Sequence, residues 1–180
     1  MKSLLVHHAI GLLLALSCAV PAVAANSKDV ARAKNTGQLG ECTRCDLSGA
    51  NLENGFFQLA VLNEANISSA NLNGANLAGA QLNNANMRNA TLVYANLSGA
   101  RMEGADLRGA DLGQAWLNWA WFAGAKLDGV NFTNAKMIGA QLQGADLSKA
   151  IGLTKSQLDQ ACGDSQTKLP PGMKAPFCLF

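Results

Sequence analysis

The 180-residue sequence has little of the chemistry that enzymes use. Its two histidines, His7 and His8, lie close to the N-terminus, so the rest of the chain offers no imidazole for a catalytic triad, a general base or a metal ligand. Charged residues make up only 14% of the chain, with 14 basic and 12 acidic side chains. This balance excludes the basic surface typical of nucleic-acid-binding proteins. We predict no catalytic residues, no cofactor and no metal site, and we do not expect an enzyme.

Long hydrophobic runs are also missing, except near the N-terminus. Residues 9–20 are apolar, follow Lys2 and precede the small residues 22–24, a pattern typical of a secretory signal peptide. The run is too short to span a membrane. We therefore interpret residues 1–25 as a signal peptide and expect a periplasmic or secreted protein without a membrane span. A lipoprotein attached through Cys18 is disfavoured, because residues 15–17 fit a lipobox poorly.

What the sequence does contain is a five-residue repeat that runs without interruption from Cys45 to Lys149, twenty-one fives in all. The first residue of each five is alanine eighteen times, the third is always large and apolar, and the fifth is Gly or Asn fourteen times. A period of five matches neither a helix nor a flat strand, and a fixed short period is typical of a solenoid. We expect the first and third residues to point inward and each fifth residue to form a turn.

Fives such as ANLSG at 95–99 and ADLRG at 105–109 resemble the pentapeptide-repeat family. This resemblance implies an all-β solenoid, a right-handed quadrilateral β-helix with four fives to a coil and about five coils. It also implies a bacterial protein. The predicted organisation is then a signal peptide (1–25), an N-terminal cap (26–44), the pentapeptide-repeat β-helix (45–151) and a C-terminal helix with a disulfide-stapled cap (152–180).

Both caps are predicted to contain a short helix, because an open solenoid end exposes apolar surface and unpaired backbone. The first helix would begin at Asn26 or Ser27 and end near Gly37. The second would begin at a capping box formed by Thr154 and Gln157, and would run to about residue 162.

Four cysteines follow the signal peptide, and an even number in an exported chain favours disulfides. On the resemblance, Cys42 and Cys45 lie at one end of the coil and Cys162 and Cys178 at the other, roughly 25 Å apart at about 4.8 Å per rung. That separation disfavours a four-cysteine zinc site. We predict a Cys162–Cys178 disulfide. The Cys42/Cys45 pair is either a second small disulfide or a redox-active pair, with Arg44 favouring the thiolate.

Acidic side chains are most dense at Glu103, Asp106 and Asp111, which would lie on successive outward faces of the coil and not in a cleft. We interpret them as solvated surface residues. Arg108 and Asp128, one coil apart in the same outward column, are placed to form an ion pair.

Outward positions are polar with a few apolar exceptions, and these form two groups. Phe56, Leu59 and Val61 lie early in the repeat, and Trp116, Trp119 and Trp121, the three tryptophans of the chain, lie late. Each tryptophan is 60 residues, or three coils, after its early counterpart, so both groups should lie on the same two faces, roughly 14 Å apart. We predict an interaction surface there for a partner, a ligand or a second copy of the chain. The alternatives are that the C-terminal tail covers one group, or that the match reflects an internal duplication.

The sequence therefore predicts a non-enzymatic exported scaffold or protein-interaction module, either a monomer or a weak side-by-side homodimer, with an unknown protein partner and no nucleic acid. One alternative is a thiol-redox protein that uses the Cys42/Cys45 pair. The other is a topoisomerase-binding DNA mimic, a role known in the family. A mimic requires a strongly acidic surface and a cytoplasmic location, neither of which this sequence indicates.

Overall fold

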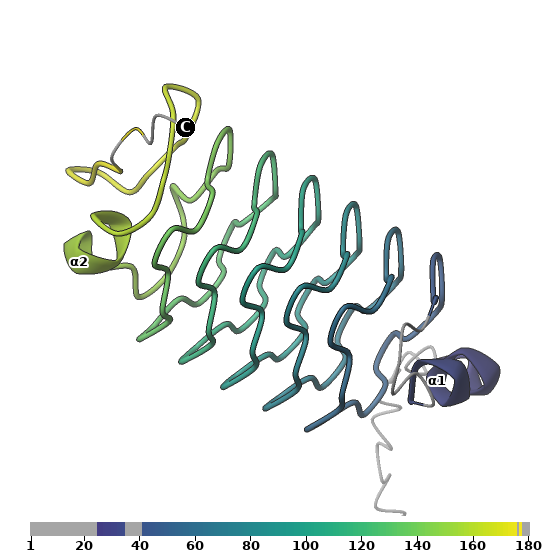
Figure 1. The fold of residues 1–180 in the computed structure, drawn as a ribbon. Helices are drawn as coiled ribbons and strands as arrows, with labels where there is room; N and C mark the ends of the chain where they lie inside the picture. Colours follow the sequence, from purple (N-terminus) through teal and green to yellow (C-terminus); the bar gives the residue numbers. More distant parts are fainter. Residues whose placement is uncertain (1–24, 35–40, 176, 178–180) are drawn as a thin grey trace, which may run out of the picture.

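The chain winds into a stack of rectangular coils with a short helix at each end (Figure 1). The computed structural model describes residues 25–34, 41–175 and 177. Parallel β-bridges join residues twenty positions apart in successive coils, from Glu41–Val61 to Asn131–Ile151. The fold is a right-handed quadrilateral β-helix, which confirms the predicted fold class. In the described part of the chain, no helix is long and apolar enough to cross a membrane.

Each coil has four faces of five residues. We call them the first face (45–49), the second face (50–54), the third face (55–59) and the fourth face (60–64), each with its repeats every twenty residues. The third residue is buried in all twenty-one fives, and the first is buried in twenty, with Gly55 as the exception. The predicted inward positions are therefore confirmed. They fill the interior with leucine, methionine and phenylalanine packed against alanine.

In the units from 65 to 124, backbone hydrogen bonds pair four of the five amides. The third and fifth residues donate to the following coil, the second donates to the preceding coil, and the first closes a turn onto the third residue before it. Around the first unit these bonds are Leu47 N to Asn66 O, Gly49 N to Ser68 O, Asn66 N to Cys45 O and Ala50 N to Leu47 O, at 2.7, 2.8, 2.8 and 3.1 Å. Only the amide of the fourth residue has no backbone acceptor.

A side chain accepts the hydrogen bond of this fourth amide. Wherever the second residue is Asn or Asp, in eleven of the twenty-one fives, its Oδ1 accepts from the amide two residues later. In four more fives, an asparagine at the fourth position one coil earlier supplies the oxygen; these are Asn63, Asn73, Asn83 and Asn118. The frequent Asn and Asp at the second position therefore have a structural cause.

Helix α1 (Ser27–Lys34) covers the first coil. The side-chain oxygen of Asn26 accepts a hydrogen bond from Lys28 N at 3.0 Å. The backbone amide of Asn26 donates to the carbonyl oxygen of Asp46 at 3.1 Å. The carboxylate of Asp29 accepts a hydrogen bond from Asp46 N at 3.0 Å. Polar groups at the start of the helix thus take the place of the backbone of a preceding coil at this edge. The bridges begin at Glu41, four residues before the predicted start of the β-helix. The predicted helix end near Gly37 lies outside the described residues.

Helix α2 (Lys155–Leu158) covers the last coil and begins at the predicted capping box. Gln157 N donates to Thr154 Oγ1 at 3.2 Å, and Thr154 N donates to Gln157 Oε1 at 2.8 Å. The helix ends at Leu158, earlier than predicted, because the chain then turns to pair Cys162 with Gln141 of the last coil. The tail thus continues the β-bridges, which a capping pattern alone cannot indicate.

An aspartate also closes the C-terminal edge. Asp164 Oδ1 accepts from Gly144 N at 3.0 Å, and also from the amides of Gln166 and Thr167 at 3.0 and 2.9 Å. These donors, that of Gly144 first, hold the pKa of Asp164 below its ordinary value. Each end of the coil therefore uses a carboxylate to accept a rung amide.

A substitution at an inward alanine tests this packing. Ala100 is fully buried, so Ala100→Leu should overpack the coil and lower the free energy of unfolding by about 1–3 kcal/mol. Ser98→Leu, on the outward side of the same turn, is the matched control and should have little effect. Chemical denaturation of both variants measures the difference, and equal stabilities would contradict the inward assignment.

The lowered pKa of Asp164 predicts acid sensitivity of the C-terminal cap. Because the folded pKa lies below that of the unfolded chain, about 3.9, the carboxylate stabilises the fold above that pH and loses this contribution as the pH falls further. Asp164→Asn should lower Tm at pH 7, and the difference from the wild type should shrink toward pH 2. A difference in Tm that is independent of pH would show that the charge has no role there.

Candidate functional site

The two groups of outward apolar residues lie in shared columns. Successive bridges link Phe56 to Trp116 through Asn76 and Asn96. A second set links Val61 to Trp121 through Gln81 and Arg101. The predicted register, with a spacing of three coils, is therefore present. We call Phe56, Leu59 and Val61 the early apolar cluster, and Trp116, Trp119 and Trp121 the tryptophan corner.

Most of these side chains are open to solvent. Phe56 is 77% exposed, Leu59 is 53% exposed and the three tryptophans are 44–58% exposed, whereas Val61 is half-buried. The tail therefore does not bury the tryptophan corner, contrary to one of the alternatives above.

Three of the aromatic residues stand where most fives have an Asn or Asp that accepts a backbone hydrogen bond. Phe56, Trp116 and Trp121 occupy second positions, where Asn or Asp would accept the fourth amide. Within the part of the chain that the structure describes, the fourth amides that follow, those of Gln58, Asn118 and Ala123, have no hydrogen-bond acceptor. The aromatic side chains thus remove the acceptor that Asn or Asp supplies to this amide elsewhere in the coil.

Leu59 and Trp119 occupy fifth positions, where the backbone turns with positive φ. Their φ values are 60° for both residues, a conformation that suits glycine and is strained for bulky side chains. The indole of Trp119 lies across the backbone of Gly139, where a Cβ atom would come within 2.3 Å of it. Leu59 lies in the same way over Gly79, with 2.7 Å to such a Cβ. Glycine one coil later makes room for each side chain.

Two cations flank the tryptophan corner. Lys136 Nζ lies 4.8 Å from the centre of the Trp116 ring, and the Arg101 guanidinium lies 5.9 Å from that of Trp121. Neither cation forms an ion pair with an acid among the described residues. The corner is therefore aromatic and cationic, with both charges attracted to the rings.

The third face, by contrast, is almost uncharged. Lys136 is the single charge among its fifteen outward positions from 56 to 139, whereas the first face carries eight charges in eighteen such positions. Many of those charges pair with one another. Arg108 binds Asp106 at 2.5 Å, which lowers the pKa of that carboxyl, and Asp128 pairs with Lys149 at 3.9 Å. The expected Arg108–Asp128 pair is thus wrong, because Arg108 reaches an acid on its own strand.

The acidic residues form no catalytic pair. Glu103, Asp106 and Asp111 lie on the fourth, first and second faces at outward positions. However, Oε2 of Glu103 is buried without a hydrogen-bond partner in the part of the chain that the structure describes, so this side chain is not fully solvated, contrary to expectation. No group of three His, Cys, Asp or Glu side chains in the described ranges is arranged to hold a metal ion.

Cys42 and Cys45 are joined by a disulfide whose sulfur atoms point into the first coil. The two residues occupy inward third and first positions and are 1% and 2% exposed. Arg44 points outward and pairs with Glu64 at 2.7 Å, so its charge is engaged away from the sulfurs. Burial disfavours the redox alternative, because an attacking thiolate must reach a sulfur atom. The predicted partner of Cys162, Cys178, lies outside the described residues, and that pairing stays a prediction.

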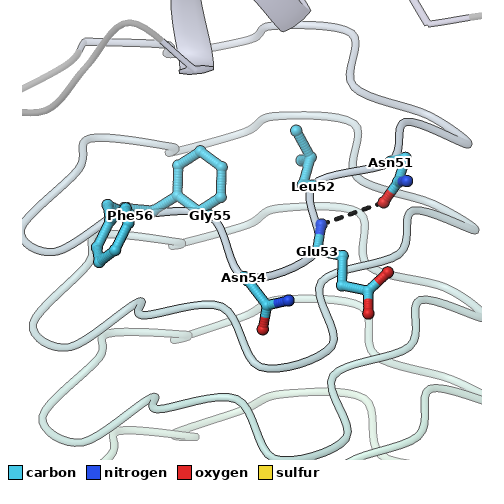
Figure 2. A pocket seen from close by; sticks show the side chains of 7 residues that line it. Asn51, Leu52, Glu53, Asn54, Gly55 and Phe56 are labelled. Atoms are coloured by element: carbon cyan, nitrogen blue, oxygen red, sulfur yellow. Dashed lines mark hydrogen bonds between the residues drawn. The ribbon is translucent and has the colours of Figure 1, made fainter.

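A hollow of about 550 Å³ lies at the edge of the first coil (Figure 2). Residues 51–57 line it, with the Asn51 side chain bound to the amide of Glu53 at 3.2 Å. Glu53 is its one charged side chain among the described residues. One carboxylate and two amides supply neither a nucleophile nor an acid–base pair, so this hollow offers no catalytic chemistry.

Within the twenty-one fives, two further exposed large apolar residues were not identified from the sequence. Ile138 is exposed on the third face, and its carbonyl accepts from Trp119 N at 2.8 Å, so it extends the tryptophan corner by one coil. Tyr94 is exposed at a fifth position of the second face, at a φ of 61°. Both could have been identified from the sequence, because each is a large apolar residue at an outward fourth or fifth position of its five.

Comparison with known proteins supports the repeat assignment. The family model described as pentapeptide repeats matches eight copies, over residues 41–79, 70–109, 85–120 and 115–151. No curated protein matches the chain. Among solved structures, HetL from the cyanobacterium Nostoc sp. strain PCC 7120, a pentapeptide repeat protein involved in heterocyst differentiation regulation, is 27% identical over 71% of this chain and 65% of its own, with a TM-score of 0.41.

Two other solved pentapeptide repeat proteins are similar to this chain. Rfr23 from the cyanobacterium Cyanothece 51142 is 29% identical over 61% of this chain and 63% of its own, with a TM-score of 0.39. A thylakoid-lumen protein from Arabidopsis thaliana is 30% identical over 66% of this chain and 81% of its own, with a TM-score of 0.32. The chain therefore spans less than two thirds of HetL and of Rfr23.

Restoring the repeat at the tryptophan corner tests whether the coil needs these residues. Trp116→Asn and Trp121→Asn supply the missing acceptors, and Trp119→Gly relieves a strained turn. The triple variant should therefore keep the fold, with a Tm equal to or higher than that of the wild type. Tyr94→Gly, at an equivalent turn away from the corner, is the matched control. A clear fall in the Tm of the triple variant, measured by circular dichroism, would show that the tryptophans are structural.

Proposed function

Because the chain belongs to the pentapeptide-repeat family, we propose that it is a non-enzymatic, exported scaffold that binds a protein partner through the tryptophan corner. One observation carries this proposal. Trp116 and Trp121 stand where the coil uses Asn or Asp, and no other side chain replaces the lost acceptor among the described residues.

The composition of the corner fits protein recognition. Tryptophan and arginine are enriched among the residues that dominate binding energy at protein interfaces, and contiguous exposed apolar surface is uncommon on monomers. Arg101 lies beside Trp121, and Ile138 adds aliphatic surface next to Trp119. The rigid coil holds these side chains in place before binding, which reduces the entropy lost on association.

Export is supported by the N-terminal sequence. Residues 1–25, most of which lie outside the described residues, have the pattern of a secretory signal peptide. The Cys42–Cys45 disulfide agrees with an oxidising compartment. These two features support our proposal that the protein acts in the periplasm or outside the cell.

A thiol titration separates this scaffold from a redox protein. The native mature protein should show no reactive thiol, and mild reductant should not reduce the buried Cys42–Cys45 disulfide without unfolding. A pair of thiols that reacts in the native state, and that cycles with an external disulfide, would support the redox alternative instead.

Affinity capture from an envelope extract tests the proposed binding. The mature protein is the bait, and the fold-preserving variant with Trp116→Asn, Trp119→Gly and Trp121→Asn is the comparison, with Tyr94→Gly as the control. We expect one partner to be retained by the wild type and by the control and lost with the triple variant. Equal capture by all three baits would contradict a role for the corner.

A further inference from the structure

The third face carries a pair of large apolar side chains at two places, three coils apart. Phe56 and Leu59 lie at the early end, and Trp116 and Trp119 lie three coils later in the same two columns. The residues between them in the columns of the second, fourth and fifth positions are small or amidic: Asn76, Ala78, Gly79, Asn96, Ser98 and Gly99. The result is a flat strip with an apolar pair at each end.

We propose that this strip is the contact between two copies of the chain, packed face to face with antiparallel coil axes. The proposal rests on the proposed function, because it names a partner for two of the same tryptophans, Trp116 and Trp119. A two-fold axis that runs along the strands, midway between the rungs of Asn76 and Asn96, places Phe56 opposite the second copy's Trp116. The same axis places Leu59 opposite the second copy's Trp119. Since the two ends share their columns, both contacts form at once, as a two-fold interface requires.

The charge distribution favours this face over the first face for self-association. A two-fold contact brings each face against itself, so a charged face meets its own charges. The third face carries Lys136 alone, beyond the strip, whereas the first face carries eight charges. The amides of Asn76 and Asn96, which face each other across the axis, can both donate and accept, and so they suit a self-complementary contact.

The glycines of the strip leave room for the aromatic side chains of the second copy. Gly99 has no atom within 4 Å of the position that a Cβ would occupy, so the space above it is open. Gly79 is covered only by the side chain of Leu59. A tryptophan or phenylalanine ring from the facing copy can therefore lie along the strip, where offset ring packing is favourable.

The size of the face predicts a weak dimer. Four rungs of about 4.8 Å and five residues of about 3.3 Å give roughly 320 Å² of flat area in each copy. A standard stable interface buries about 800 Å² in each partner. The dimer should therefore form reversibly at high protein concentration. Trp121 lies on the fourth face and outside this contact.

Sedimentation equilibrium of the mature protein over a wide concentration range tests the geometry. We expect a monomer–dimer equilibrium in the wild type. Phe56→Asn with Leu59→Gly, and separately Trp116→Asn with Trp119→Gly, should each weaken the dimer by at least about tenfold. Tyr94→Gly is the matched control and should leave the dissociation constant unchanged, and Trp121→Asn reports whether the contact lies on the fourth face instead. Circular dichroism of each variant verifies that the coil is intact.

Several outcomes would overturn the proposal. A wild type that stays monomeric at all concentrations excludes the dimer, and a dimer weakened by only one of the two double variants excludes the antiparallel contact. A dimer weakened by Trp121→Asn would place the contact on another face. A monomeric protein that still captures an envelope partner through the tryptophan corner would overturn this inference alone, whereas a monomer with no such capture would overturn the proposed function as well.

Discussion

The structure depends on how the amide of the fourth residue in each five is satisfied. The other four amides pair with the backbone of the same or a neighbouring coil, but the turn leaves this one without a carbonyl. A hydrogen bond to such an amide contributes about 0.5–1.5 kcal/mol, and the same amide recurs at every five. An Asn or Asp side chain two residues earlier, or an asparagine one coil earlier, supplies this bond in fifteen of the twenty-one fives. These polar residues therefore maintain the coil and are not evidence of binding.

Positions where no side chain accepts the hydrogen bond of the fourth amide are the better candidates for function. Within the described coils, six fives lack a side-chain acceptor, and their second residues are Phe56, Val61, Trp116, Trp121, Lys126 and Gln141. Four of the six belong to the two apolar clusters, which share their columns. A sequence that departs from its own structural pattern at exposed positions points to a requirement other than folding. Leu59 and Trp119 also place bulky side chains at turns of positive φ on the third face, as Tyr94 does on the second face.

Much of this could be predicted from the sequence, because a strict period indicates which residues point inward. The burial of Leu47 and its repeats follows from that period, whereas the alignment of Trp116 with Phe56 also needs the four fives to a coil that the family resemblance implies. Contacts between outward side chains do not follow, because long side chains choose among several partners. Arg108 binds Asp106, two residues away on the same side of one strand, and not the acid one coil later. The early start of the β-helix was missed because Cys42, not a leucine, occupies the first inward position.

Amide hydrogen exchange, followed residue by residue in the native protein, tests the central role of the fourth amide. The account predicts slow exchange at Ser98 and Ser148, whose amides donate to Asn96 and Asp146 at 3.1 Å, and at Val93, whose amide donates to Asn73 at 2.9 Å. It predicts fast exchange at Asn118 and Ala123, which follow Trp116 and Trp121. Equal protection at all five amides would show that the side-chain acceptors do not maintain the coil, and would remove the reason to regard the tryptophans as a functional departure from it.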